Sequence, residues 1–150
     1  ALKLLCEKMP EVEVVFAGWD ISTFEIPFKY RDMGIMSVDK LSKVYSQCDL
    51  CLIISNTNLS LLPLEVMASN SVAVCSKGSN STWLVNEENA VLVEYEPRNI
   101  ADTMEYYLTH PDELAEIRSK GLAFAQSTSW EKEAEKVRDA LLEGIKEDDK

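Results

Sequence analysis

Ser55-Asn-Thr-Asn-Leu-Ser-Leu-Leu-Pro-Leu-Glu-Val-Met-Ala68 is the stretch of sequence that decides the fold of this chain. It follows an apolar run at residues 50–54, so the pattern predicts a buried strand, a polar loop and then a helix. In an open α/β sheet, ligands bind beyond the carboxyl ends of the strands, where helix N-termini offer free N–H groups. The stretch predicts a nucleotide-binding edge; the simpler alternative is a capped helix with a solvated glutamate.

Pro63 sets the register of the predicted helix. Because proline has no N–H and clashes with the carbonyl four residues earlier, it fits in the first turn of a helix. Ser60 is then the predicted N-cap, and Leu61 and Leu62 carry free backbone donors. Glu65 is expected in the second turn, close enough to the helix start for its carboxylate to reach the hydroxyls of a ribose.

Apolar runs alternate with helical patterns along the rest of the chain, which predicts an α/β fold. We expect a Rossmann-like domain of three layers, with a parallel sheet and a helical C-terminal segment. The expected strands are residues 12–16, 26–30, 50–54, 72–75 and 90–93. The expected helices are residues 1–9, 38–48, one that starts after Ser60, 100–108, 111–124 and the segment after 129, with a short helix around 83–84.

Two of these helices have predicted caps. Ser37 is the expected N-cap of the helix at 38–48. Thr128-Ser-Trp-Glu131 fits a capping box, in which the threonine hydroxyl and the glutamate carboxylate satisfy each other's backbone N–H groups. The last helix should therefore begin sharply after Thr128.

Four segments, taken in order and spacing, resemble the C-terminal donor-binding domain of retaining GT-B glycosyltransferases of family 4. They are Leu41-Ser-Lys-Val-Tyr-Ser-Gln-Cys-Asp-Leu-Cys-Leu-Ile-Ile54, Leu64-Glu-Val-Met-Ala-Ser-Asn-Ser-Val-Ala-Val-Cys75, Asn86-Glu-Glu-Asn-Ala-Val-Leu-Val93 and Ser129-Trp130. The resemblance covers nearly the whole chain and implies one half of a GT-B fold. Residues 58–65 and 78–90 look most like rhamnosyltransferases of the rhamnan and surface-polysaccharide type.

The resemblance implies that the candidate residues surround one nucleotide diphosphate sugar. They are Glu65 at the ribose, Ser60, Leu61 and Leu62 at the diphosphate, Thr57 and Asn58 near the sugar, Gly34 and Met36 near the base, and Lys77 beside a phosphate. A plain turn at Gly34 and a solvated Lys77 are the simpler alternatives. In the family the last helix crosses onto the N-terminal domain, so without that domain its apolar side is either exposed or folded back.

Two positions depart from the family pattern. Thr57 stands eight residues before Glu65, where the family has a glutamate that contacts the donor sugar. Thr82 stands where many relatives have an acid in the loop after the next strand. Either the donor is unusual, such as a deoxysugar with fewer hydroxyls, or this copy is weakened.

The chain of 150 residues, 46% of them hydrophobic, suits a single domain. We interpret residues 1–150 as a donor-binding domain whose N-terminal acceptor domain and first strand are absent. The resemblance also places upstream an Arg and a Lys that clamp the donor diphosphate. On its own, this fragment is expected to be inactive.

The net charge of −11 argues against nucleic acid and against an anionic membrane surface as partners. Four cysteines at positions 6, 48, 51 and 75 are interpreted as buried reduced thiols, because Cys48 and Cys51 lack the turn of a zinc knuckle. No apolar run approaches the ~18 residues of a membrane span. We expect a cytoplasmic protein, held at the inner face of the membrane only through the rest of the polypeptide.

No catalytic residue is predicted within this chain. The one histidine, His110, precedes Pro111 in a turn between helices, and no hydrolase or phosphate-loop motif is present. We expect a transferase half that works without a metal or cofactor and moves a sugar, with rhamnose as the candidate, to a glycan or lipid-linked acceptor through the missing domain. The alternatives are a non-catalytic scaffold or regulatory module, and half of a nucleotide-sugar epimerase.

Overall fold

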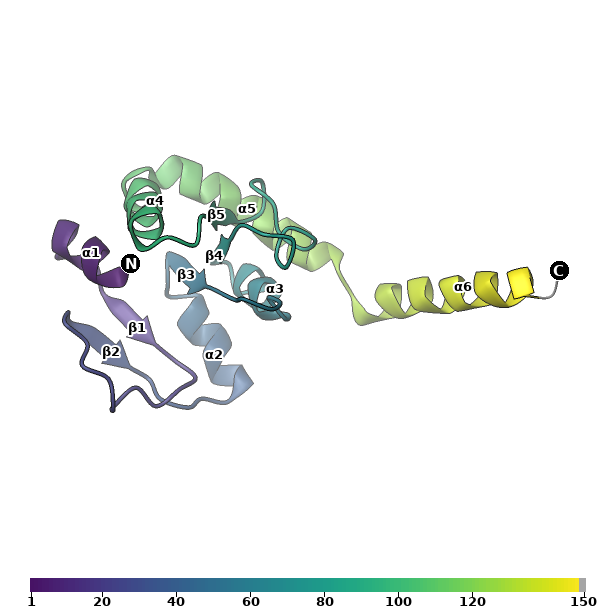
Figure 1. Ribbon diagram of the computed structural model, residues 1–150, viewed down its shortest axis with the longest axis horizontal. Helices are drawn as coiled ribbons and strands as arrows, with labels where there is room; N and C mark the ends of the chain where they lie inside the picture. The colour runs from purple at the N-terminus through teal and green to yellow at the C-terminus, as the bar shows by residue number, and fades with distance from the viewer. Residues whose placement is uncertain (149–150) are drawn as a thin grey trace.

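A computed structural model describes the backbone of residues 1–148 and the side chains of residues 1–144. The helices are α1 (Leu2–Lys8), α2 (Val38–Tyr45), α3 (Leu62–Ala68), α4 (Pro97–Thr109), α5 (Pro111–Ser127) and α6 (Trp130–Asp148). The strands are β1 (Val14–Phe16), β2 (Tyr30–Asp32), β3 (Leu50–Ile53), β4 (Val72–Ser76) and β5 (Val91–Val93). The α/β, Rossmann-like class predicted from the sequence is confirmed (Figure 1).

The strands form two parallel sheets. β3, β4 and β5 pair in that order, with β4 in the centre, and β1 pairs with β2. The sequence predicted a single parallel sheet. The pairing stops between β1 and β3, so each of these two apolar strands has one free edge in the described chain.

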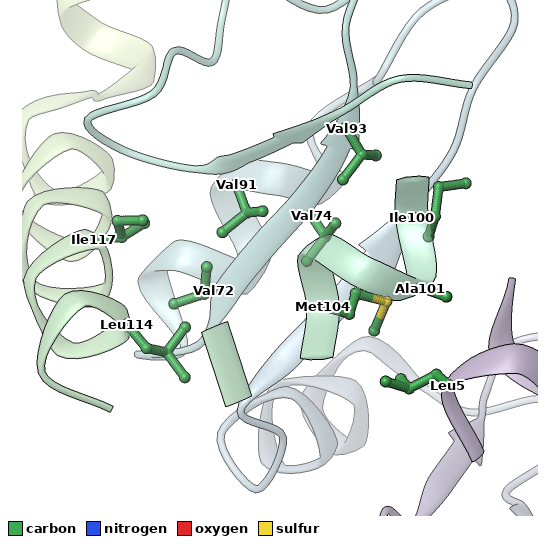
Figure 2. Packing of buried hydrophobic residues seen from close by; sticks show 10 residues of the cluster. All are labelled: Leu5, Val72, Val74, Val91, Val93, Ile100, Ala101, Met104, Leu114 and Ile117. Carbon is green, nitrogen blue, oxygen red and sulfur yellow. The ribbon is translucent and has the colours of Figure 1, made fainter. Parts of the chain in front are cut away.

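β4 lies at the centre of the fold, and all five of its residues are buried. Because side chains alternate across a strand, Val72 and Val74 face one side of the sheet while Ala73 and Cys75 face the other. The first side is covered by α1, α4 and the start of α5, and Figure 2 shows its packed aliphatic residues. The second side is covered by α3, with Val66 and Met67 buried completely. This sandwich is the predicted three-layer arrangement.

Gly121 lets α5 approach the second side of the sheet. A Cβ atom at this position would lie 2.9 Å from the backbone oxygen of Asn89 and 3.2 Å from Cγ of Met67. A larger residue would push α5 away from α3, so the small residue here sets the distance between the two helices.

Two predicted elements differ in the structure. The strand expected at residues 26–30 is wrong: β2 begins at Tyr30, and Phe28 lies outside the strand, where it stacks on Phe16 at 6.4 Å between ring centroids. Pro27 has no N–H to donate to a neighbouring strand, so the expected run could not pair throughout. The short helix expected around residues 83–84 is a series of turns. There the Ser81 hydroxyl donates to the carbonyl of Gly78 at 3.0 Å and the Trp83 indole donates to that of Asn80 at 3.0 Å. Such side-chain bonds compete with a helical ladder.

The predicted caps are only partly correct. Ser37 is the N-cap residue of α2, but its side chain makes no cap hydrogen bond. The capping box at residues 128–131 is wrong. The Ser129 hydroxyl accepts the N–H of Lys132 at 3.2 Å and so caps α6, whereas Thr128 donates to the carbonyl of Ala125 at 2.7 Å and closes α5.

α6 projects away from the rest of the molecule (Figure 1). Its apolar residues are exposed: Trp130 at 75%, Val137 at 61% and Leu141 at 64%. Of the two arrangements considered from the sequence, the structure has the exposed one. Within the described residues, α6 and the other helices are too short or too polar to cross a membrane.

Candidate functional site

Two polar loops meet at the carboxyl edge of the three-stranded sheet. Because β3 and β4 run parallel, the loop after β3 (residues 55–61) and the loop after β4 (residues 77–83) leave from the same edge. The Asn80 carboxamide joins them by donating to the carbonyl of Ser55 at 2.7 Å. The strand, loop and helix predicted from residues 50–68 therefore lie where an α/β fold binds its ligands.

The loop after β3 is stabilised by its own side chains. The Asn58 carboxamide oxygen accepts the N–H of Ser60 at 3.0 Å, and the Ser55 hydroxyl donates to the carbonyl of Asn58. Leu59 is 2% exposed and packs into the core. The buried Leu59 fixes the loop to the core. The polar residues on either side of it remain exposed at the surface: Thr57, Asn58 and Ser60.

The helix after this loop begins one residue later than predicted. Leu61 is the N-cap of α3, and the Ser60 hydroxyl lies 3.5 Å from the N–H of Leu62, at the limit of a hydrogen bond. Ser60 is in the left-handed region with φ of 51°, because Asn58 captures its N–H and turns the chain. Glu65 consequently lies in the first turn rather than the second, nearer to the helix start than expected.

Glu65 is exposed and lines a cleft of about 370 Å³ between α3 and the start of α6. The other lining residues are mostly apolar, including Leu61, Leu64 and Trp130, with the polar Thr128 and Ser129 at the α5–α6 junction. The cleft thus offers two carboxylates, those of Glu65 and Glu133, beside apolar and hydroxyl groups.

Tyr45 shows that the charge of Glu65 acts on its neighbours. Burial is the largest cause that raises the pKa of Tyr45, and the negative charge of Glu65 adds to the rise. The phenol stays protonated at neutral pH, so it is an uncharged neighbour of Glu65 rather than a competing ion.

Gly34 and Met36 follow β2 and therefore belong to the two-stranded sheet. Gly34 has φ of 60°, its N–H donates to the Asp32 carboxylate at 2.8 Å, and its carbonyl accepts the N–H of Gly18 at 2.8 Å. The turn is held tightly, while Ile35 beside it is 84% exposed. The structure places these residues just beyond the carboxyl end of β2. Their position beside the base of a nucleotide stays a prediction.

Lys77 lies in a second hollow of about 550 Å³, beyond the end of β4. Its ammonium lies 3.2 Å from the Glu87 carboxylate, and Thr82 and Glu88 also line this hollow. A phosphate beside Lys77 would have to compete with Glu87. Neither the pairing with Glu87 nor the joining role of Asn80 was predicted, because both depend on the path of the loop between β4 and β5.

The structure thus groups the predicted residues into three sets. Thr57, Asn58, Ser60 and Leu61 share one loop, and Leu61 and Glu65 line the same cleft with Leu62 at the start of the helix between them. Lys77 faces the second hollow, and Gly34 and Met36 lie on the other sheet. The sequence did not predict that Thr128 and Trp130 line the cleft. The only indication of a role for this region was that Ser129-Trp130 is one of the segments that resemble the family.

His110 lies in the turn between α4 and α5. Its ring stacks on Tyr106 with centroids 4.0 Å apart, and its Nδ1 lies 2.7 Å from the Tyr106 carbonyl oxygen. The Tyr106 hydroxyl donates to Glu113 at 2.8 Å. These contacts give the histidine a packing role between helices. Among the side chains that the structure describes, those of residues 1–144, the His, Cys, Asp and Glu residues form no cluster of three suited to a metal ion. The four cysteines are free thiols, and the prediction that they are buried is correct for Cys75 alone.

Residues 1–105 match the family model described as WsaF, C-terminal domain. The chain belongs to the WsaF C-terminal domain family. Its fold is that of the C-terminal domain of GT-B glycosyltransferases, which confirms the GT-B part of the resemblance. Membership of family 4 and the rhamnosyltransferase type stay predictions.

A curated relative of this WsaF-type domain is the O-antigen biosynthesis protein RfbC of Myxococcus xanthus, 28% identical over 138 residues. The match covers 89% of this chain and 11% of that protein. The domain therefore spans about a tenth of the length of the curated relative it matches.

Two solved structures show the same fold. The sucrose-phosphate synthase from Thermosynechococcus elongatus superposes with a TM-score of 0.77 at 16% identity, over 96% of this chain and 41% of that one. Anabaena Alr3699/HepE in complex with UDP-glucose gives a TM-score of 0.75 at 17% identity, over 95% of this chain and 44% of that one. In both, the WsaF-type domain corresponds to less than half of the solved chain.

Proposed function

We propose that this chain is the donor-binding half of a retaining, family 4-like glycosyltransferase. In the full-length protein it would help to transfer a sugar from a nucleotide diphosphate sugar to a glycan or lipid-linked acceptor. The observation that carries the proposal is the exposed Glu65 in the first turn of α3, at the carboxyl edge of the sheet and in a cleft of about 370 Å³. HepE, which shares this fold, was solved with UDP-glucose.

In this proposal the ribose hydroxyls donate to the Glu65 carboxylate. Hydrogen bonds to a charged acceptor are stronger than neutral ones, and an exposed carboxylate in an open cleft makes them without prior rearrangement. The apolar Leu61 and Leu64 flank Glu65 and cover the carbon face of the pentose. The cleft therefore matches the mixed chemistry of a nucleoside.

The diphosphate would lie at the loop that leads into α3. The first N–H groups of a helix have no partner within the helix, and the peptide dipoles add a partial positive charge there. Leu61 and Leu62 occupy these positions. As the bond between sugar and phosphate breaks, these groups stabilise the charge that develops on the leaving diphosphate. We propose that this works without a metal or cofactor, assisted by cations from the rest of the protein.

The sugar would lie beside Thr57 and Asn58. A neutral hydroxyl at position 57 accepts fewer and weaker hydrogen bonds from a sugar than a carboxylate does. The Asn58 side chain is already engaged with Ser60. A deoxysugar such as rhamnose needs fewer partners, so we infer that the donor is of this kind. Gly34 and Met36 would then lie on the base side.

We also propose that an additional parallel strand lies between β1 and β3. Both strands have one unpaired edge in the described chain. Leu50, Cys51 and Leu52 of β3 are only half-buried although the strand is wholly apolar, as central strands of parallel sheets are. A strand from a longer polypeptide that also carries the acceptor domain would join the two sheets into one.

Calorimetric titration with UDP, dTDP and GDP tests the site. At least one of these nucleotides should bind, and Glu65→Gln should weaken it about tenfold, the loss expected when a charged hydrogen-bond acceptor becomes neutral. Glu143→Gln, an exposed residue on α6, is the matched control and should leave the affinity unchanged. Equal affinities for the wild type and Glu65→Gln would contradict the proposed ribose contact.

A non-catalytic scaffold is the second candidate function. The observation in its favour is that Thr57 replaces an acid while Glu87 neutralises Lys77 at 3.2 Å. Sugar transfer measured on the full-length protein separates the two candidates. Turnover that Glu65→Gln reduces supports the transferase, whereas nucleotide binding without turnover supports the scaffold.

A further inference from the structure

Trp83 is a large aromatic residue in the loop after β4, at the carboxyl edge of the three-stranded sheet. It is 62% exposed, although Ser81 and Val85 on either side of it are buried. The Trp83 indole N–H donates to the Asn80 carbonyl at 3.0 Å. Because an indole has no other hydrogen-bonding group, the exposed part of this side chain is carbon surface, which interacts with a ligand by packing against it.

The turn that carries Trp83 is held by its own backbone. The N–H groups of Ser81 and Thr82 both donate to the Gly78 carbonyl at 3.0 Å, and the N–H of Val85 donates to the Ser81 carbonyl at 3.1 Å. The indole is in turn fixed to this backbone by its bond to Asn80. A side chain that is already ordered loses little conformational entropy when a ligand packs on it, so Trp83 is a preformed surface.

Asn80 places this turn beside the loop that we propose to face the sugar. Its backbone carbonyl accepts the Trp83 indole N–H, and its carboxamide donates to the Ser55 carbonyl at 2.7 Å. The Ser55 hydroxyl donates to the carbonyl of Asn58. A chain of three hydrogen bonds therefore connects the indole with the part of the loop that contains Thr57 and Asn58.

The polar groups near Trp83 are mostly neutral. Thr57 and Thr82 carry hydroxyls and Asn80 carries a carboxamide, while the ammonium of Lys77 is engaged by the Glu87 carboxylate at 3.2 Å. An aromatic face beside neutral polar groups suits a sugar ring. The C–H groups of a pyranose are weakly positive and pack on the negative face of an aromatic ring, and its hydroxyls bind the polar groups at the margin.

We propose that Trp83 is a stacking surface for the pyranose ring of a 6-deoxyhexose and that Asn80 positions it. In a 6-deoxyhexose a methyl group replaces the C6 hydroxyl, so the sugar gains apolar surface and needs one hydrogen-bond partner fewer. The inference rests on the proposed function, because a sugar at this edge is either the one carried by the donor nucleotide or the end of the acceptor glycan. Both sources have the same chemistry.

Titrations with dTDP-rhamnose, UDP-rhamnose and GDP-rhamnose, each paired with its own nucleotide, test the contact with a donor sugar. The ratio of the two affinities isolates the contribution of the sugar. In Trp83→Leu this ratio should fall about tenfold, the effect of losing a well-stacked aromatic ring, while the affinity for the nucleotide stays unchanged. Trp83→Phe should keep most of the ratio, since a smaller ring still stacks.

Trp19→Leu is the matched control for this ratio. Trp19 is also highly exposed, at 72%, but it follows β1 on the two-stranded sheet, so the ratio should not change. Asn80→Ala tests the positioning role. It removes the bond to Ser55 and keeps the backbone carbonyl that holds the indole, so the ratio should fall at constant nucleotide affinity. A substitution that only destabilised the fold would weaken the nucleotide and its rhamnose ester equally.

Methyl α-L-rhamnopyranoside gives a second measurement that needs no nucleotide. In NMR spectra it should shift the indole N–H signal of Trp83 and leave that of Trp19 in place. Methyl α-L-mannopyranoside, which differs only by a hydroxyl on C6, should shift the Trp83 signal less. A shift caused by the nucleotide-linked rhamnose but not by the nucleotide assigns the contact to the donor sugar, whereas a shift caused by the methyl rhamnoside alone assigns it to the acceptor.

The two measurements separate failure of this inference from failure of the proposed function. The inference is overturned if no rhamnoside moves the Trp83 signal, or if Trp83→Leu binds every rhamnoside as the wild type does. Nucleotide binding that depends on Glu65 would then still support the proposed function. If the methyl rhamnoside moves the Trp83 signal in a protein that binds no nucleotide, the proposed function is contradicted and the stacking surface is supported.

Discussion

The three-stranded sheet and the two-stranded sheet have the same strand direction and very different packing. Every residue of β4 is buried, with helices on both sides, whereas every residue of β2 is exposed. Glu65 and the loop at residues 55–61 stand on the well-packed sheet, and Gly34 stands on the open one. The difference indicates that the ribose and diphosphate side of the proposed site is preorganised, while the base side depends on a smaller set of contacts.

The largest expected difference in the free energy of unfolding comes from replacing a valine by alanine in each of the two sheets. Val74→Ala in β4 removes two buried methyl groups from a residue that is 0% exposed and should lower the free energy of unfolding by about 2–3 kcal/mol. Val15→Ala in β1, which is half-buried, should cost about 1 kcal/mol or less. Urea unfolding measures both. Equal losses would show that the two sheets are equally packed.

Gly121→Ala probes the packing of α5 on the well-packed sheet. The new methyl would meet the Asn89 carbonyl oxygen at 2.9 Å, so we expect a loss of about 1–3 kcal/mol despite the better helix propensity of alanine. Thermal unfolding measures the loss. A variant as stable as the wild type would mean that α5 can shift without disturbing α3.

Gly34→Ala probes the open sheet. The position has space for a methyl group but φ of 60°, so backbone strain should cost about 1 kcal/mol. Gly144→Ala on α6 is the matched control, because it also has space and should instead stabilise its helix by up to about 1 kcal/mol. If Gly34→Ala and Gly144→Ala moved the urea midpoint in the same direction, the left-handed turn assigned to Gly34 would be contradicted.

The smallest expected effect is the pH dependence of the α4 cap. The Asn99 N–H donates to the Glu96 carboxylate at 2.7 Å, and this bond is the main cause that lowers the pKa of Glu96. A carboxyl with a lowered folded pKa contributes stability above its unfolded pKa and loses it as the pH falls through the folded value. The difference in Tm between the wild type and Glu96→Gln should therefore shrink below about pH 4.5. A constant difference from pH 7 to pH 3 would exclude this role.

The well-packed sheet was also the better predicted one. The apolar runs that become β3, β4 and β5 are bounded by polar loops, and Pro63 fixed the helix after β3 to within one residue. Their local patterns agree with their final packing, so periodicity was enough. β2 was misplaced because its observed residues, Tyr30–Asp32, are all exposed and so have no apolar pattern that marks them as a strand.

Details of the site depend on contacts that spacing does not encode. Ser60 satisfies the preferences of an N-cap, but the Asn58 side chain takes its N–H and shifts the start of α3. From the sequence, Lys77 was expected to lie beside a phosphate or to be solvated. In the structure its ammonium pairs with the Glu87 carboxylate. Both outcomes depend on the path of the backbone through a loop, which the spacing of residues in the sequence does not predict.

The central claim is that a nucleotide sugar binds in the cleft beside Glu65 and not in the hollow beside Lys77. Backbone amide shifts in NMR spectra, followed as UDP or dTDP is added, test it most directly. The largest shifts should fall on residues 57–65 and 128–130. Shifts centred on residues 82–88, with those around Glu65 unchanged, would contradict it.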